Sequence, residues 1–565
     1  MDNTVQIHLD LREPASQTFW VKQSWKPCSH RLSIQLPVWT PGSYTVRDHV
    51  QHLHSLELHS GESQVPLRRS GPSSWRADLS ELTTVEVRYA VEARDLTVRT
   101  CFLDPTFASL CLAGAVMEVE GCRWQTHQLE ISVPDTWEAF VPLQRNNHFW
   151  IADDFDALVD SPVHAGPFKI EQFLVKGYTH ELLLIGSPPS GWPKNLLSDI
   201  SAVCEATCRL MDSPPAAGDR YQLVLQMRAE GYGGLEHDHG AVLQFNWHTL
   251  AQPDGYRKLL QLVGHEYLHQ WNVRRLRPQE YRPYDYSQAI VSESLWFAEG
   301  ITSYFDLVTT MIAGCSDRKS FLVDLSEELS RVLMTPGREV QSLACSSEEA
   351  WVKLYKASPP SRDSQVSYYG LGAATAFCLD VRLRQKQTSL ARLVRKLWQT
   401  HGVCRRGYNR EDVLALVREH DQSLAEDLIS WLDQPASLPL QSIVSSLGLR
   451  LEAVASKDPY HGLTLKEDSG QLLVRRVAAK SPALKANLVV GDELIAISGR
   501  RLRRLNDLPL LLRGQSSVAI TYSRHGHLAE TLLNPDEGVD RWQLDWDPRA
   551  TTKQMALRDR WFQIL

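Results

Sequence analysis

The stretch "GHEYLHQWN" at residues 264–272 decides how the rest of the chain is interpreted. Residues four apart on an α-helix share one face, so His265 and His269 are spaced to hold a single ion between them. Glu266 is turned roughly 100° from His265 at 3.6 residues per turn, which directs it toward a water on that ion rather than toward the ion. The neighbouring residues are apolar, which favours a helix that faces the protein interior. The stretch therefore predicts part of a metal site.

A catalytic zinc site needs three protein ligands and one open position. Two candidates for the third ligand lie in "VSESLWFAEGITSYFDL", at residues 291–307. The apolar neighbours of Glu299 would desolvate it unless it met a cation, whereas Glu293 starts a predicted helix, where the helix dipole alone favours an acid. We therefore expect Glu299 to be the ligand. Asp306, two helical turns further on, would accept a ring N–H from a ligating histidine; a solvated surface acid is the alternative.

The whole chain has the composition of an ordinary globular protein. Its 565 residues suggest about three or four domains. Hydrophobic residues make up 43%, and the net charge of -7 gives no basic surface for nucleic acid. There is no apolar run of about 18 residues and no signal-peptide pattern at the start. Ten scattered cysteines without a CxxC pair argue against a disulfide framework. We expect a cytoplasmic protein that contacts neither membrane nor nucleic acid.

The patterns along the chain predict a multidomain α+β fold. Alternating strands separated by Pro, Gly and Ser clusters indicate an N-terminal β-sheet domain at residues 1–163. Residues 164–440 begin with strands and then become mostly helical, as in a catalytic domain. A smaller unit follows at 446–530, and 531–565 is expected as a C-terminal tail.

The third unit resembles a PDZ domain. Its sequence "GQLLVRRVAAKSPALKANLVVGDELIAISGRRL" contains a strand, "SPA", a short helix, "GD" and a second strand, in that order. Asn487 stands where such domains usually have glycine, and asparagine tolerates the left-handed conformation that this turn needs. The resemblance implies a groove that binds a peptide C-terminus or strand. A purely structural role in packing is the alternative.

The pattern of "GHEYLHQWNV" followed by "LWFAEGITSYF" resembles the gluzincin metallopeptidases, whose catalytic domain is thermolysin-like. In those enzymes two histidines and a downstream glutamate bind Zn²⁺. The closest likeness is the glycyl aminopeptidase family with a C-terminal PDZ domain, because "LPVWTPGSYTVRD" at 36–48 also looks like that family's hallmark. In the aminopeptidase N group the glutamate follows the second histidine after about nineteen residues, whereas Glu299 follows His269 by 30.

The resemblance also implies roles in catalysis. Glu266 would be the general base that activates water. The segment "SYYGLGAATAF" resembles the one that supplies a tyrosine hydroxyl to the oxyanion. Tyr369 fits the register with the following glycine, and Tyr368 is the alternative. Leu371 stands where a lysine is common in the clan, which weakens that register.

The segment "GYGGLEHDHG" looks like the exopeptidase motif of the clan. Its Glu236 would bind the α-amine of the substrate, while Gly233 and Gly234 let the backbone approach an extended peptide. A plain glycine-rich hairpin is the alternative for this segment.

These residues together predict a zinc-dependent aminopeptidase that acts on peptides with a free N-terminus. The preference for glycine and alanine follows from the family resemblance alone. The first alternative is a zinc endopeptidase whose PDZ domain delivers unfolded chains. The second is a peptide-binding scaffold with an inactive site.

Overall fold

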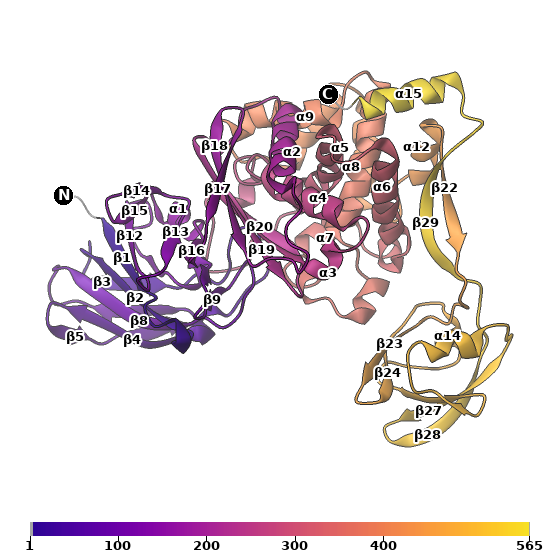
Figure 1. Ribbon diagram of the computed structural model, residues 1–565, viewed down its shortest axis with the longest axis horizontal. Coiled ribbons are helices and arrows are strands. Elements are labelled where there is room, and N and C mark those ends of the chain that lie inside the picture. Colours follow the sequence, from indigo (N-terminus) through magenta and orange to yellow (C-terminus); the bar gives the residue numbers. More distant parts are fainter. Residues whose placement is uncertain (1–3, 564–565) are drawn as a thin grey trace.

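The computed structural model describes residues 4–563 and contains an N-terminal β domain, a larger central domain and a C-terminal β module (Figure 1). The N-terminal and central domains lie side by side, and the C-terminal module extends from the central domain on a two-stranded ribbon. This arrangement agrees with the expected multidomain α+β class, with its β-sheet domain first and its helical domain second.

The N-terminal domain is built around an eight-stranded sheet. Its strands alternate buried and exposed residues, as in β1, where Val5, Ile7 and Leu9 point into the core. The strand order is β14 (Gln144–Asn146), β15 (Phe149–Ala152), β12 (His127–Ser132), β1 (Val5–Asp10), β2 (Thr18–Trp25), β8 (Val85–Glu92), β4 (Leu53–Ser60) and β5 (Ser63–Val65).

Two smaller sheets complete the N-terminal domain. One contains β11 (Glu118–Val119), β3 (Arg31–Gln35), β7 (Ser74–Asp78) and β6 (Arg68–Gly71). The other contains β13 (Glu138–Phe140), β16 (Val163–Gly166), β10 (Ala108–Leu110) and β9 (Cys101–Leu103). Because β16 pairs with β10 and β13, the strands of this domain continue to residue 166, three residues beyond the expected boundary.

Three buried histidines make the N-terminal domain sensitive to acid. Burial lowers the pKa of His49 to about 3, of His127 to about 4 and of His164 to about 3. In the unfolded chain all three titrate near 6.5, so the unfolded state binds more protons at any pH between these values. Their contribution to stability is complete above pH 6.5 and is lost as the pH falls toward 4. We expect a loss of about 4 kcal/mol between pH 7.5 and 5.5.

Thermal unfolding followed by tryptophan fluorescence at pH 7.5, 6.5 and 5.5 measures this loss. The variant His164→Gln should lose about a third less stability over the same range, because one of the three groups no longer titrates. An unfolding temperature that is independent of pH in this range would contradict the expectation.

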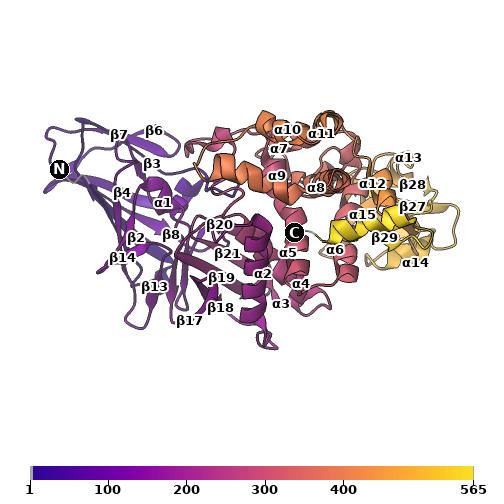
Figure 2. The ribbon, with the colours of Figure 1, turned by 90° about the horizontal axis from the view of Figure 1, so that it is seen from above.

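The central domain combines a five-stranded sheet with a helical body. The sheet order is β17 (Ile170–Val175), β18 (Tyr178–Ile185), β19 (Arg220–Arg228), β21 (Gly240–Asn246) and β20 (Gly233–His237), so β20 lies at an edge. The helices nearest to the sheet are α2 (Leu196–Met211), α3 (Trp247–Leu250) and α4 (Gly255–Leu268). Figure 2 shows α2 running beside β18 and β19.

The remaining helices of the central domain follow α4 in the chain and form the rest of the helical body. They are α5 (Ile301–Ile312), α6 (Arg318–Leu333), α7 (Leu343–Glu348), α8 (Tyr368–Gln385), α9 (Leu390–Leu397), α10 (Arg410–Arg418), α11 (Gln422–Asp433) and α12 (Leu440–Ser446). Among residues 4–563, none of the helices is both long and apolar enough to cross a membrane.

The N-terminal domain reaches into the central domain through the loop that contains "LPVWTPGSYTVRD". Trp39 is fully buried, and its indole N–H donates to the Asp285 carbonyl at 2.7 Å. Its ring packs edge-on against Tyr284 and Trp351. Tyr44 also packs on Trp351. Such aromatic pairs add about 0.5–1.5 kcal/mol each beyond their buried area, so the loop fixes the N-terminal domain against the central one.

The C-terminal module has a separate hydrophobic core. Its strands are β23 (Leu463–Asp468), β24 (Gln471–Val477), β25 (Glu493–Ile497), β27 (Val518–Arg524) and β28 (His527–Leu533), in that order, and β26 (Arg500–Arg501) pairs with β25. The short helices are α13 (Pro482–Lys485) and α14 (Asp507–Leu512). Asn487 has φ 58°, the left-handed conformation that the sequence predicts.

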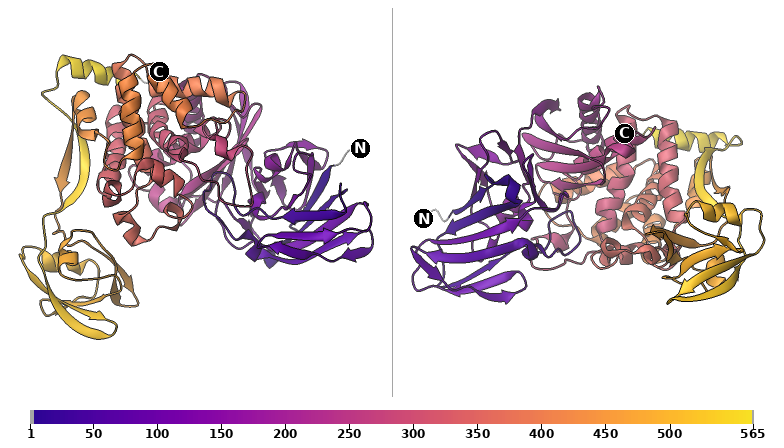
Figure 3. Two further views of the ribbon diagram at one scale, coloured as in Figure 1. Left: turned by 180° about the vertical axis from the view of Figure 1, so that it is seen from behind. Right: turned by 60° about the horizontal axis from the view of Figure 1, so that its bottom comes forward.

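Residues 531–565, expected as a tail, contain a strand and a helix in the part that the structure describes. Strand β29 (Val539–Trp546) pairs antiparallel with β22 (Leu449–Ala455) and forms the ribbon that carries the module. The chain then returns as α15 (Thr552–Phe562), visible beside the helical body in Figures 1 and 3. Trp561 is 1% exposed, and its N–H donates to the Tyr304 hydroxyl at 2.9 Å. Helix α15 is therefore part of the core of the central domain.

The C-terminal module can be removed at the point where the chain enters and leaves it, without removing α15. The Ser456 amide donates to the Gly538 carbonyl at 2.8 Å, so the two ends of the module meet. We expect that replacing residues 457–537 by a four-residue glycine-serine linker leaves the unfolding temperature of the remainder unchanged within about 3 °C.

Truncation at residue 446 is the matched comparison, because it also removes β22, β29 and α15. The buried side chains of Leu557, Trp561 and Phe562 then leave the core, at a cost of roughly 5 kcal/mol or more. Differential scanning calorimetry of both variants tests this. Equal unfolding temperatures would show that α15 adds nothing to stability.

Candidate active site

Helix α4 carries the two histidines of the HExxH stretch at its C-terminal end. His265 lies in the last turn and His269 is the C-cap, whose amide still bonds to the His265 carbonyl at 3.3 Å. The two imidazole centroids are 4.8 Å apart. The helix is buried on nearly all sides, and His269 is 1% exposed. The helical spacing predicted from the sequence is therefore present, and both rings face one cavity.

Glu299 reaches the histidines from a π-helical turn. Residues Trp296–Gly300 form this turn immediately before α5. A π-turn widens the helix locally and often occurs at functional sites. Gly300 packs so closely on Gly372 of α8 that a Cβ at residue 300 would lie 2.5 Å from the Gly372 Cα. The turn and this close helix contact direct Glu299 toward α4, where it is 2% exposed.

The three side chains converge on one point. Glu299 Oε2 lies 3.5 Å from His265 Nε2 and 3.3 Å from His269 Nε2. Burial alone would raise the pKa of Glu299, but the neighbouring His269 and His265 outweigh it and hold the pKa below its ordinary value. One ligand atom from each residue lies within 4.8 Å of the others, which is the spacing of a shared metal ion. The alternative acid, Glu293, instead pairs with Arg410 at 3.1 Å.

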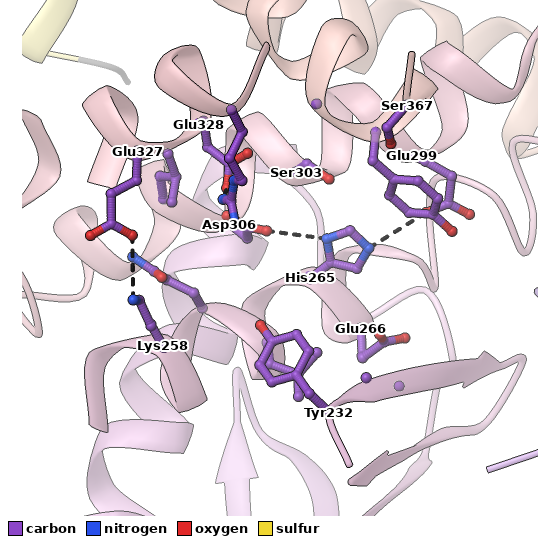
Figure 4. Close-up of a pocket in the computed structure, with 18 of the residues that line it drawn as sticks. Tyr232, Lys258, His265, Glu266, Glu299, Ser303, Asp306, Glu327, Glu328 and Ser367 are labelled. Carbon is purple, nitrogen blue, oxygen red and sulfur yellow. Dashed lines mark hydrogen bonds and ion pairs between the residues drawn. The ribbon is translucent and has the colours of Figure 1, made fainter. Parts of the chain in front are cut away.

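Each histidine is oriented by a second hydrogen bond. His265 Nδ1 lies 3.1 Å from Asp306 Oδ2, as Figure 4 shows. His269 Nδ1 lies 2.6 Å from the Asn272 carbonyl oxygen. When both Nδ1 atoms donate a proton, each Nε2 keeps its lone pair free for a metal ion. Asp306 is thus a partner of a candidate ligand rather than a solvated surface acid.

Glu266 and Glu236 face the same cavity from two different elements. Glu266 is 4% exposed, and one of its carboxylate oxygens is buried without a hydrogen-bond partner among residues 4–563. The same holds for one oxygen of Glu236 on β20. Burial raises the pKa of Glu266, and the charges of Glu236 and Glu299 add to the rise. Two buried carboxylates with unused acceptors indicate that a ligand completes the site.

Glycines make room for these carboxylates. A Cβ at Gly234 would overlap the Glu266 carboxylate, and a Cβ at Gly42 would lie 2.5 Å from a Glu236 oxygen. Gly42 also has φ 82°, which other residues rarely adopt. Gly233, with φ 138°, begins the edge strand β20, whose outer side pairs with no other strand among the described residues. An extended peptide fits such an edge.

The two candidate tyrosines lie at the start of α8 but differ in what they face. Tyr369 lines the cavity, and its ring is 6.4 Å from that of His265. Tyr368 is fully buried and packs against Tyr44. The hydroxyls of both lie 3.0 Å from that of Tyr355. This geometry favours Tyr369 as the residue that reaches a ligand.

Arg99 and Tyr355 are two site residues that the sequence interpretation did not include. Arg99 comes from the N-terminal domain and donates to the Gly234 carbonyl at 2.9 Å, and its Nε is buried without a partner among residues 4–563. Neither residue belongs to a recognisable local motif. Arg99, for example, is 135 positions away in sequence from Gly234, which it contacts. Only the fold brings them together.

The cavity around these groups measures about 920 Å³. One end contains Gly42, Arg99 and Glu236, and the other extends along α4 and α6 past Lys258 and Glu327, which pair at 3.3 Å (Figure 4). This volume is within the range of cavities that bind small organic ligands.

Two family models match the sequence. The M61 glycyl aminopeptidase model matches residues 258–375, and the peptidase M61 N-terminal domain model matches residues 6–167. No curated protein matches the chain.

Among solved structures, an aminopeptidase N family protein from Idiomarina loihiensis is 27% identical, with a TM-score of 0.91 and coverage of 99% of this chain and 100% of that chain. An M1 zinc metallopeptidase from Deinococcus radiodurans is 12% identical, with a TM-score of 0.47 over 78% of this chain and 95% of that chain. Native yeast LTA4 hydrolase is 11% identical, with a TM-score of 0.49 over 79% and 70%.

Proposed function

Because this chain belongs to the M61 glycyl aminopeptidase family, we propose that it is a zinc aminopeptidase that removes small N-terminal residues, glycine and alanine foremost, from peptides. The observation that carries the proposal is the meeting of five side chains in one cavity, four of them buried and His265 partly exposed. Three of them, His265, His269 and Glu299, could bind a metal ion together. The other two, Glu266 and Glu236, each have a carboxylate oxygen without a hydrogen-bond partner among residues 4–563.

The donor set fits zinc. Two imidazole nitrogens and one carboxylate oxygen are ligands that zinc binds in catalytic sites, and one position stays open for water. Both ring Nδ1 atoms are already engaged, by Asp306 and by the Asn272 carbonyl, so the Nε2 atoms are the ones that would bind. When bound, zinc supplies a Lewis acid that lowers the pKa of a water molecule and polarises the scissile carbonyl.

Glu266 would move the protons of the reaction. Its carboxylate accepts a proton from the attacking water and later delivers it to the leaving amine. Burial raises its pKa, which brings a carboxylate closer to neutral pH and makes it a better base. A Cβ at Gly234 would occupy the space of this carboxylate, so the glycine is needed at that position.

Tyr369 would donate its hydroxyl proton in a hydrogen bond to the oxyanion that forms on the scissile carbonyl. Tyr355 would orient it, since the two hydroxyls lie 3.0 Å apart. We expect Tyr369→Phe to lower kcat by about 10²-fold with little change in KM, as for other single oxyanion donors.

Tyr368→Phe is the matched control for Tyr369. The two residues are adjacent and both contact Tyr355, but Tyr368 does not line the cavity. Its variant should keep kcat within about threefold. A larger loss in Tyr368→Phe than in Tyr369→Phe would reverse the assignment.

Glu236 would recognise the free N-terminus. A carboxylate buried without a partner favours an ammonium group, because the ion pair offsets the cost of desolvation. Gly233 and Gly234 would pair with the substrate backbone along the edge of β20. Gly42 lies directly against Glu236, and its loop would limit the space for the first side chain of the substrate.

Two other functions use the same site differently. A zinc endopeptidase would need no amine-binding carboxylate at the metal, and the buried Glu236 argues against it. A non-catalytic peptide-binding scaffold would not need Glu266 beside the metal ligands. We also propose that the C-terminal module is a PDZ domain that binds a peptide C-terminus or strand. The ten free cysteines favour a cytoplasmic location.

A peptide library incubated with zinc-loaded and with chelated enzyme tests the proposed function. We expect zinc-dependent release of single N-terminal residues, with glycine and alanine fastest. Internal cleavage would support the endopeptidase. Absence of any cleavage at full zinc occupancy would support the scaffold.

A further inference from the structure

A second large cavity lies between the N-terminal and central domains. It measures about 1210 Å³ and shares no lining residue with the active-site cavity. Trp124 and Leu143 line it from the N-terminal side, and Arg277, Tyr284 and Arg405 line it from the central side. Nothing in the proposed peptidase mechanism uses this space.

Arginines are in excess at one end of this cavity. Four of them line it, namely Arg274, Arg277, Arg282 and Arg405. Arg275 lies directly behind them, since its carbonyl accepts from Arg282 at 2.6 Å. Two carboxylates face them, that of the buried Asp160 and that of the partly exposed Asp238. Both bind the same residue, Arg274, at 2.7 and 2.9 Å. Within residues 4–563 the other four arginines form no ion pair with a carboxylate.

Burial makes this excess of charge costly. Arg275 and Arg277 are 6% and 8% exposed, and the Nε atoms of Arg277 and Arg282 are buried with no hydrogen-bond partner between residues 4 and 563. Burial, together with the charges of Arg277 and Arg405, lowers the pKa of Arg282 to about 10. Buried cations without anions are strongly destabilising unless a partner is supplied.

The remaining acids that line the cavity do not neutralise the arginines. Asp156 is paired with Arg123 at 2.8 Å. Asp154 caps helix α1 (Phe155–Val159) through the Ala157 amide. Asp153 and Asp219 are exposed, so solvent screens them.

We propose that this arginine end of the cavity is a binding site for a small oxyanion carrying two negative charges, with phosphate as its representative. A guanidinium group can donate two parallel hydrogen bonds to two oxygens of a phosphate. It is also weakly hydrated, so it loses little by lying in a recessed site. Arg277 is already held in place by stacking on the Tyr284 ring, 4.0 Å from its centroid.

The site connects to the strand that carries Glu236. Asp160 accepts from the Asp238 amide at 2.7 Å and lies 3.2 Å from His237 Nδ1, and both of those residues follow Glu236 directly. Asp160 therefore links the arginine cluster to the end of β20. The proposal stands independently of the peptidase activity, since it concerns binding at a separate cavity.

Phosphate binding to the full chain can be measured by calorimetry and by thermal unfolding. Sodium phosphate is titrated at pH 7.5 against sodium chloride of equal ionic strength. We expect phosphate to raise the unfolding temperature by about 2–5 °C beyond chloride at saturation. A second arm uses glycerol 3-phosphate. Tighter binding than phosphate assigns the site to an organic phosphate, whereas equal or weaker binding assigns it to the free ion.

Variants separate a binding site from a structural cluster. Arg405 is exposed, and its side chain has no hydrogen-bond or ion-pair partner within residues 4–563 to lose. Arg405→Gln should therefore unfold at the same or a higher temperature without phosphate, while its affinity for phosphate falls at least about tenfold. Arg282→Gln should lose phosphate affinity to a similar degree, but it also loses the hydrogen bond to the Arg275 carbonyl at 2.6 Å, so only its affinity is compared. Arg145→Gln is the control, because Arg145 lines the same cavity but stacks on Trp150 and donates to the Asn147 carbonyl.

The proposal is overturned if wild-type protein responds to phosphate no more than to chloride. It is equally overturned if Arg405→Gln keeps the full phosphate response. A response lost in Arg145→Gln to the same degree as in Arg405→Gln would also sink it, because the effect would then be one of general surface charge.

Discussion

Glu266→Gln should retain zinc and lose about 10³- to 10⁴-fold in kcat, because a carboxamide cannot accept the proton of the attacking water. The amide has nearly the same shape as the carboxylate, and one of the Glu266 oxygens has no partner among residues 4–563 to lose. The variant also removes a buried charge that lies near Glu236 and Glu299. We therefore expect its unfolding temperature to stay equal or to rise while its activity collapses.

The matched control is Glu327→Gln in the same cavity. Glu327 is half-exposed and pairs with Lys258 away from the candidate ligands, so its variant should keep kcat within about twofold. Zinc content by atomic absorption, kcat on glycyl amides and the unfolding temperature are measured for all three proteins. Retention of more than a tenth of wild-type turnover in Glu266→Gln would exclude Glu266 as the general base.

The histidine pair could be predicted from sequence because helical geometry fixes it. Any α-helix through residues 264–269 brings His265 and His269 to one face. Glu299 was identified by its apolar neighbours, which make an unpaired carboxylate costly. The π-helical turn that directs Glu299 could not be predicted from the sequence, because it depends on the contact between Gly300 and Gly372.

Other features depended on contacts between distant segments. The backbone carbonyl of Asn272 orients His269. Every residue has such a carbonyl, so the residue type at position 272 does not predict this contact. Arg99 reaches Gly234 across the domain junction. Helix α15 looks like a polar tail in sequence because only a few of its side chains, Trp561 among them, face the core. Arg274, Arg275 and Arg277 are close together in the sequence, but only the fold shows that they lack enough carboxylate partners.

Glu236→Gln should lower kcat/KM for peptides with a free N-terminus by about 10²- to 10³-fold, and should leave N-acetylated peptides at their low wild-type rate. Removing one partner of a buried charge pair costs about 2–5 kcal/mol, and each 1.4 kcal/mol is a factor of ten. Because the Glu236 carboxylate is 3% exposed, water cannot replace it. The loss should appear chiefly in KM if the amine is bound equally in substrate and transition state.

Gly42→Ala provides an independent approach to the same contact. The added Cβ would overlap the Glu236 carboxylate without changing its charge, so displacement alone should reproduce part of the loss on free-amine substrates. Free and acetylated forms of one glycyl peptide are compared in wild type and both variants. If Glu236→Gln slowed the two forms by the same factor, the carboxylate would serve the reacting centre rather than the amine. End-specific cleavage would then need another carboxylate near the metal ligands.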